Sequence, residues 1–144
     1  MGILRKCYIN AGAGIDCLPI TFEVKKAVAD AGLSFGSVQV FSASATTAVT
    51  VLENDVKVHE EYKAFIEKCV PAVEEKRPDR RSGTGRNFAH VRAALCGNSL
   101  SIPVAESKLM LGAWQEVVVI DFDDKVCRRE IIIVVSGESS SGGK

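Results

Sequence analysis

The sequence predicts an α+β fold in which helices and strands are interleaved without a regular β-α-β repeat. Segments 21–31 and 58–70 carry apolar residues at the three-and-four spacing of amphipathic helices. Short runs rich in valine, isoleucine and threonine, such as 47–52 and 117–122, have the composition of strands. Two pairs of runs joined by short turns predict antiparallel hairpins rather than parallel crossovers.

The N-terminal part is expected to form a hairpin followed by a helix. Residues 3–9 alternate loosely between apolar and polar side chains, and residues 15–20 are expected to pair back on them. Pro19 lacks a backbone N–H, so this second strand is expected at a sheet edge. Thr21 is expected to cap the first helix, and Gly32 is expected to end it.

The central part is expected to hold two strands, 37–44 and 47–52, joined through a cluster of small and hydroxyl residues at 42–48. This turn can present hydroxyls and amides to an anion, or it can be a tight connection only. Acidic residues at 53–55 suit the start of the second helix, because they lie at the positive end of its dipole. Pro71 is expected to end that helix.

The second helix is predicted to be a core element, with His59 beside its apolar stripe and facing solvent. The stripe consists of Val58, Tyr62, Phe65, Ile66, Cys69 and Val70. Segment 74–86, which follows, has five basic and three acidic side chains. It either folds over a phosphate-bearing ligand or is an ordinary solvated loop.

A third, short helix is expected between Asn87, as its cap, and Gly97, just past its end. Phe88, Val91 and Leu95 share one stripe of this helix, and His90 points away from them towards the small side chains of Ala93 and Ala94. A polar ring on a small-residue face is a candidate binding site. The alternative is a histidine of the surface or of a subunit contact.

The C-terminal third is predicted to consist of strands. A strand over 100–104 is followed by a turn at 105–108, and Trp114 is expected to bury its ring. Strands 117–122 and 130–135 are expected to pair as a hairpin. Residues 1–138 are expected to form one domain, and residues 139–144 are expected to be a disordered tail.

Composition excludes several classes of partner. Lysine plus arginine equals aspartate plus glutamate at 18 each, so no overall field draws the protein to nucleic acid or to a membrane surface. The five cysteines form no C-x-x-C pair and are odd in number, which favours reduced, mostly buried thiols. Without a signal peptide or an apolar run long enough to span a membrane, the protein is expected in the cytoplasm.

The segment around the third helix also resembles a known family. The pattern S-x-x-I-P-V at 99–104, followed by L-x-L-G-x-W-Q-x-V at 109–117, is similar to the signature of the YjbQ-type family of small trimeric proteins. Some members are described as secondary thiamine-phosphate synthases. The resemblance covers roughly residues 16–138. It implies a two-sheet β-sandwich of about seven strands with helices, assembled as a homotrimer with sites near subunit contacts.

Members of that family usually carry three histidines in one pocket, and this chain keeps one of them. His90 matches the histidine of the N-x-x-A-H helix, although Asn87 stands one residue closer to it than usual. Ala45 replaces the histidine that opens the H-T-T-A turn. Segment 74–86 has no histidine, and Pro78 stands near the expected position. A single imidazole rarely holds a metal tightly by itself.

The resemblance implies a weak or vestigial thiamine-phosphate synthase, which joins a pyrimidine pyrophosphate to a thiazole phosphate with His90 as proton or hydrogen-bond donor. The alternatives are a non-enzymatic trimer, a phosphometabolite-binding protein with a degenerate site, and a metal-dependent phosphoesterase. Mg²⁺ is the expected ion if a metal takes part, held weakly by Glu53 and His90 together with phosphate oxygens. The expected phosphate-binding residues are Thr46, Thr47, Asn87, Arg92 and Gln115.

Overall fold

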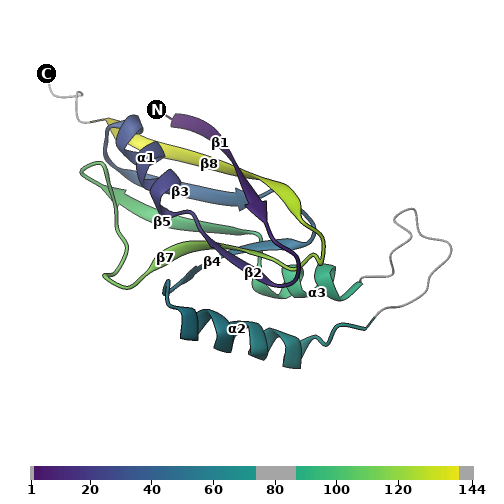
Figure 1. Cartoon of the computed structure of the whole chain (residues 1–144). Coiled ribbons are helices and arrows are strands. Elements are labelled where there is room, and N and C mark those ends of the chain that lie inside the picture. Colours follow the sequence, from purple (N-terminus) through teal and green to yellow (C-terminus); the bar gives the residue numbers. More distant parts are fainter. Residues whose placement is uncertain (1, 74–86, 140–144) are drawn as a thin grey trace, which may run out of the picture.

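The computed structural model describes residues 2–73 and 87–139, and these form two antiparallel sheets and three helices (Figure 1). The expected α+β fold with two sheets is therefore confirmed. The described residues contain eight strands, five in one sheet and three in the other. Segment 74–86, predicted to be a basic loop, and positions 140–144 of the predicted tail lie outside the described residues. Residue 139 itself belongs to the last strand.

The larger sheet is organised around its longest strand, β8 (Cys127–Ser139), which pairs with β1 (Gly2–Ala11) on one side and β3 (Leu33–Ser42) on the other. Beyond β3 lie β5 (Ser99–Ala105) and the two-residue β6 (Lys108–Leu109). The strand order is thus β1-β8-β3-β5-β6. The predicted turn between β5 and β6 is present.

The smaller sheet has the order β2-β7-β4, with β2 at Asp16–Pro19, β7 at Glu116–Asp121 and β4 at Thr47–Leu52. The expected edge position of Pro19 is confirmed. The central strand β7 is buried on both faces, because alternate side chains point to opposite sides of a strand. Val117 and Val119 belong to the core shared with the larger sheet, whereas Val118 and Ile120 pack towards α2 and α3.

Both predicted hairpins are wrong. Strand β1 pairs with β8 and not with β2, while β2 pairs with β7 in the other sheet. Strands β7 and β8 likewise belong to different sheets, although only a short turn separates them in the sequence. In each case the turn carries the chain from one layer to the other. Turn composition predicts the change of direction, but the partner of each strand depends on which layer buries its apolar face.

Helix α1 (Thr21–Ala31) packs its buried face into the core between the sheets. Thr21 does not cap the helix as predicted: Ile20 occupies the cap position, and the Thr21 hydroxyl accepts a hydrogen bond of 2.9 Å from the backbone N–H of Val117. The helix is thereby tied to β7. Gly32 ends it as predicted, with a left-handed φ of 61°.

Helix α2 (Val56–Cys69) begins and ends where the sequence predicts but packs less closely than expected. Asp55 caps it by accepting hydrogen bonds from the next turn, and the proline after Val70 follows its end. Only Ile66 of the expected stripe is buried, and Phe65 is 61% exposed. His59 is half-buried rather than solvent-facing, and its Nε2 atom is buried without a hydrogen-bond partner.

Helix α3 (Asn87–Cys96) turns the opposite face from the predicted one towards the protein. Ala89, Arg92 and Ala93 are buried, whereas Val91 and Leu95 are 52% and 61% exposed. The helix lies against β4, and small alanine side chains permit that close approach. The predicted apolar stripe therefore lies mostly on the outer side of the helix.

Two further predictions about burial are wrong. Trp114 is 75% exposed, because its glycine-containing segment forms a loop before β7 and not a continuation of the strand. Of the five cysteines, which are all free, Cys69 is exposed and the other four are half-buried. Within residues 2–73 and 87–139, no helix is long and apolar enough to cross a membrane.

Candidate functional site

A cavity of about 230 Å³ lies between the turn that precedes β4 and the face of α3 that carries His90. Helix α3 contributes His90, Ala93 and Ala94, and Gly97 follows directly. Positions 90, 93, 94 and 97 share one side of a helix, which is why this spacing in the sequence brings them to one wall. The opposite wall and the rim are formed by Ser44, Ala45, Thr47 and Asn98.

Hydrogen bonds hold the two walls of this cavity in place. The backbone carbonyl of Gly97 accepts from Val49 on β4, and the carbonyl of Asn98 accepts from Ser42 on β3. These bonds fix the end of α3 against both sheets. The position of the cavity is therefore set by the packed fold.

The two threonines of the turn use their hydroxyls within the protein. Thr47 is fully buried, and its hydroxyl contacts the Ser42 hydroxyl and the carbonyl of Ser44. The Thr46 hydroxyl accepts a hydrogen bond of 3.0 Å from Arg129 and lies 3.3 Å from the Ser44 hydroxyl. Both threonines thus determine the course of the turn beside His90.

Arg129 joins this turn to a buried carboxylate. Its Nε donates to Asp121 over 2.6 Å, and its Nη2 also reaches Asp123 at 3.3 Å. The Asp121 side chain is fully buried, and the Arg129 side chain is 14% exposed. Burial raises the pKa of Asp123, but the hydrogen bond and charge of Arg129 and further hydrogen bonds outweigh it, so that pKa lies below its usual value.

The structure brings some of the predicted site residues together and separates others. His90 and Thr47 line one cavity, Thr46 is in the same turn, and Asn87 begins α3 one turn before His90. Arg92 is on the buried side of α3 and lines a different cavity.

Glu53 and Gln115 lie at the far end of the β4–β7 pair, because Leu52 pairs with Glu116 whereas Thr47 pairs with Asp121. Six residues of strand correspond to about 20 Å. The carboxylate of Glu53 is therefore not brought to His90 within one chain. The described residues contain no group of three histidine, cysteine or acidic side chains placed to hold a metal ion.

Sequence reasoning missed Arg129 and Asp121, which support the turn. A signal was present: Asp121 is an acidic residue at the end of the apolar run VVVI, and a charge in such a run needs a partner when it is buried. The partner could not be identified, because Arg128 and Arg129 are adjacent and face opposite sides of β8. Arg128 lies over the Tyr8 ring instead, at 4.3 Å from its centroid.

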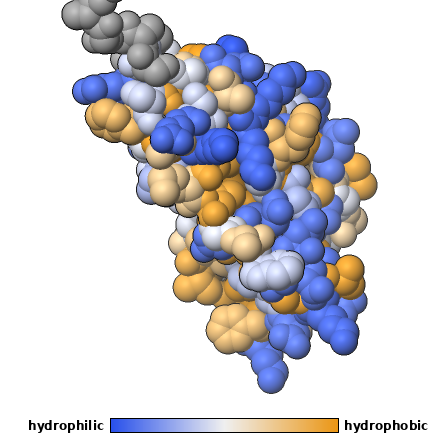
Figure 2. All heavy atoms as spheres, turned by 90° about the vertical axis from the view of Figure 1, so that its left-hand side faces the viewer, coloured by the Kyte–Doolittle hydropathy of each residue, from blue (hydrophilic) through white to orange (hydrophobic). Residues whose placement is uncertain are grey.

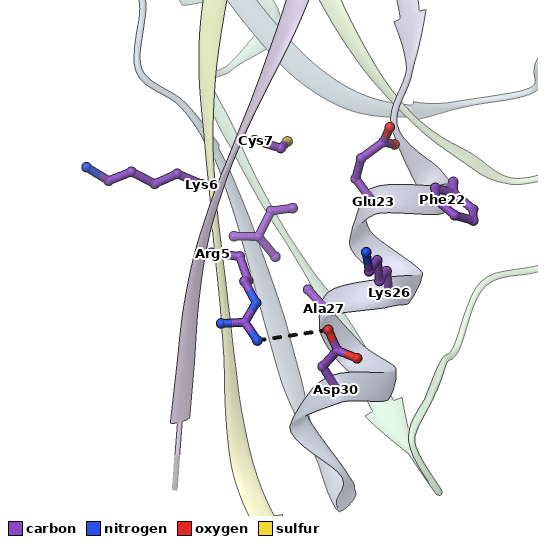
Figure 3. A pocket seen from close by; sticks show the side chains of 9 residues that line it. Arg5, Lys6, Cys7, Phe22, Glu23, Lys26, Ala27 and Asp30 are labelled. Atoms are coloured by element: carbon purple, nitrogen blue, oxygen red, sulfur yellow. Dashed lines mark ion pairs between the residues drawn. The ribbon is translucent and has the colours of Figure 1, made fainter.

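A larger cavity, of about 350 Å³, lies between β1 and α1 (Figure 3). Arg5 on β1 faces Asp30 on α1 across this cavity, with 3.9 Å between Nη2 and Oδ2, as the dashed line in Figure 3 marks. Burial and the Glu23 carboxylate raise the pKa of the Cys7 thiol that lines it. Three basic and two acidic side chains line this cavity, and Arg5 already faces a carboxylate, so little positive charge is left for an anion.

The cavity beside His90 thus sits in a small two-sheet α+β protein whose site is formed by one histidine, a hydroxyl-rich turn and small side chains. A family model described as "UPF0047 protein YjbQ-like" matches residues 5–138. The chain belongs to this family. The curated proteins that it resembles are UPF0047 proteins as well.

Among the curated proteins, a UPF0047 protein of Archaeoglobus fulgidus is 33% identical over 118 residues, which cover 82% of this chain and 90% of the relative. A UPF0047 protein of Synechocystis is 32% identical over 119 residues, with 81% and 80% covered.

Among the solved structures, a YjbQ/UPF0047 protein of Clostridium acetobutylicum has a TM-score of 0.81 at 27% identity, covering 92% of this chain and 99% of that one. A YbjQ-like protein of unknown function from Sulfolobus solfataricus has a TM-score of 0.85 at 23% identity, with 96% and 99% covered, and shows the fold alone.

Proposed function

We propose that this YjbQ-like protein binds the phosphate group of a small metabolite in the cavity beside His90. The observation that carries the proposal is the position of His90: its exposed imidazole stands over alanines and a glycine, next to polar groups of Ser44 and Asn98. An imidazole N–H and a protonated imidazole both donate hydrogen bonds to phosphate oxygens. The small neighbours leave room for the phosphate to approach the backbone.

The size and chemistry of the cavity support binding better than metal-dependent hydrolysis. A volume of about 230 Å³ suits a phosphate or pyrophosphate group with part of its carrier. Since Glu53 lies far along β4, a magnesium ion entering the cavity would be held by phosphate oxygens and water. The metal-dependent phosphoesterase is therefore the least supported alternative.

The binding proposal is tested by NMR, because the chain has only two histidines. Titration with inorganic pyrophosphate is expected to shift the imidazole resonances of His90 and to leave those of His59 in place. His90→Ala is expected to weaken binding about tenfold, the usual effect of removing one charge-assisted hydrogen bond. His59→Ala serves as the matched control. Equal affinity of wild type and His90→Ala would contradict the proposal.

The protein is further proposed to assemble as a homotrimer, as the family resemblance implies. The exposed apolar side chains support self-association: Phe65 on α2 and Val91 and Leu95 on α3 are each more than half exposed. Figure 2, in which the left-hand side of Figure 1 faces the viewer, shows further apolar side chains among hydrophilic ones. A subunit packed on Val91 and Leu95 would border the cavity beside His90.

Analytical ultracentrifugation tests the assembly. The wild type is expected to sediment as a trimer, and Leu95→Glu is expected to dissociate it, because a charge at an apolar contact would be buried without a partner. Lys68→Gln changes the charge of an exposed residue of α2 by one unit in the same direction and is the control. A monomeric wild type would refute the proposed assembly.

A second candidate function is weak thiamine-phosphate synthase activity, which the family signature and the retained His90 favour. The protein would hold the pyrophosphate that leaves the pyrimidine precursor, and His90 would donate a hydrogen bond to it. Purified protein with both precursors and magnesium is expected to form thiamine phosphate faster than His90→Ala does. Pyrophosphate binding without any such difference in turnover would leave the binding function and exclude the synthase.

A further inference from the structure

A third cavity, of about 580 Å³, lies on the other side of α3 from His90. It is formed where the end of α2, the buried side of α3, the β1–β2 turn and the start of the β7–β8 connection meet. Phe88, Phe122 and Ile15 supply apolar surface, and Arg92, Glu67 and Asp124 supply charge. This volume falls in the range of small-molecule sites, which combine apolar walls with a few polar groups.

Arg92 is the unusual residue of this cavity, because only 3% of it is exposed and no carboxylate of the described residues forms an ion pair with it within 4.0 Å. Its Nε donates to the carbonyl of Val70 over 2.9 Å, and its guanidinium lies 5.0 Å from the centre of the Phe88 ring. Its Nη2 atom is buried and has no hydrogen-bond acceptor. A buried, unsatisfied donor on a charged group is costly, so an acceptor that arrives with a ligand would be favoured.

The carboxylates of the cavity stand apart from Arg92. Glu67 raises the pKa of Arg92 by its charge, although burial has the larger, opposite effect. The two side chains form no ion pair within 4.0 Å among the residues that the structure describes. Asp124 also lines the cavity. One wall therefore presents a positive donor, and other parts of the lining present negative charge.

We propose that this cavity binds a small zwitterion of the α-amino-acid type with an apolar side chain. The carboxylate of the ligand accepts from Nη2 of Arg92, and its ammonium group faces Glu67 and Asp124. The apolar side chain packs on Phe88 and Phe122. A simple anion fits less well, because the two carboxylates of the lining would repel it. The site is separate from the cavity beside His90, so neither proposal depends on the other.

Three related probes test the proposal on the full-length protein. L-phenylalanine has both charges, 3-phenylpropionate lacks the ammonium group, and 2-phenylethylamine lacks the carboxylate. NMR titration that follows the Nε–H resonance of Arg92 is expected to show saturable binding of L-phenylalanine. Its affinity is expected to exceed that of either analogue about tenfold, because each analogue loses one charge-assisted contact. No saturable shift up to about 10 mM would overturn the proposal.

Variants separate the two halves of the site. Arg92→Gln is expected to reduce the affinity for L-phenylalanine about tenfold or more, with circular dichroism to confirm that the variant is folded. Glu67→Gln, on the exposed surface, is expected to reduce the ratio of the affinity for L-phenylalanine to that for 3-phenylpropionate, because the ammonium group would lose one of its two carboxylate neighbours. Glu61→Gln, also exposed on α2 but outside the cavity, is the matched control. An unchanged preference in Glu67→Gln, or equal affinity of all three probes, would overturn the zwitterion assignment.

Discussion

The replacement Arg129→Gln tests whether the buried ion pair with Asp121 holds the β7–β8 connection and the turn beside His90. It removes the guanidinium that donates to Asp121, Asp123 and the Thr46 hydroxyl. Asp121 is fully buried, so the replacement would leave its carboxyl group in the interior without the guanidinium that compensates it. The turn at Thr46 would also lose one of its hydrogen bonds.

The expected loss of stability follows from this geometry. Removing one partner of a buried ion pair costs roughly 3–5 kcal/mol, because the other charge is left uncompensated. Asp121 keeps a hydrogen bond of 2.8 Å from the backbone N–H of Asp123. The loss is therefore expected at the lower end, about 3 kcal/mol. In the double variant with Asp121→Asn, the loss is expected to be smaller than the sum of the single losses, because no charge remains buried.

Equilibrium unfolding in urea at one fixed protomer concentration measures this difference, with linear extrapolation to water. Arg128→Gln is the matched control, since Arg128 is the neighbouring residue but lies exposed over the Tyr8 ring. Its loss is expected to stay below about 1 kcal/mol, the value of an exposed cation–π contact. A similar loss for both arginine variants, or a loss below about 1 kcal/mol for Arg129→Gln, would refute the reasoning.

Three further outcomes follow from the structure. Gly36→Ala is expected to lower the free energy of unfolding, measured in urea, by about 2 kcal/mol or more, since its Cβ would overlap the backbone of β8. Gly2→Ala is the control and is expected to lower it little, because the nearest atom to its Cβ would lie at 3.4 Å. The pKa of Asp123 is lowered in the fold, so its carboxylate stabilises the protein above about pH 4, and this contribution is lost as the pH falls further. Between pH 7 and pH 3, Asp123→Asn is therefore expected to lose less stability than the wild type. Iodoacetamide, followed by mass spectrometry, is expected to label exposed Cys69 before half-buried Cys7, whose pKa is raised; labelling in the reverse order would contradict this expectation.

Local features of the sequence predicted the helices well. The end of α1 at Gly32, the start of α2 directly after the acidic residues 53–55 and the end of α2 before Pro71 are all as expected. Each depends on residues within one or two turns of the helix end, so the relevant interactions are present in a short stretch of chain. The helical spacing also placed Ala93 and Ala94 beside His90, and all three line one cavity.

Other predictions failed because they depend on which residues meet in space. Turn composition could not show that β1 pairs with β8 rather than with β2. Helical periodicity predicted that His90 points away from the stripe with Val91 and Leu95, but these apolar residues suggested the wrong buried side of α3. The five residues expected to bind phosphate are not brought to one place: Thr47 lines the cavity beside His90, Arg92 lines another cavity, and Gln115 lies at the far end of the β4–β7 pair.

The sequence by itself determined the α+β class, the limits of the helices, the edge position of Pro19 and the family signature, because short-range geometry and composition specify them. The tertiary structure alone decided that β1 and β2 lie in different sheets, that Arg129 compensates Asp121, and that Arg92 faces its own cavity. These outcomes depend on burial and on charge pairing between segments far apart in the chain. Such pairings are chosen by the free energy of the whole packed fold and not by any local stretch.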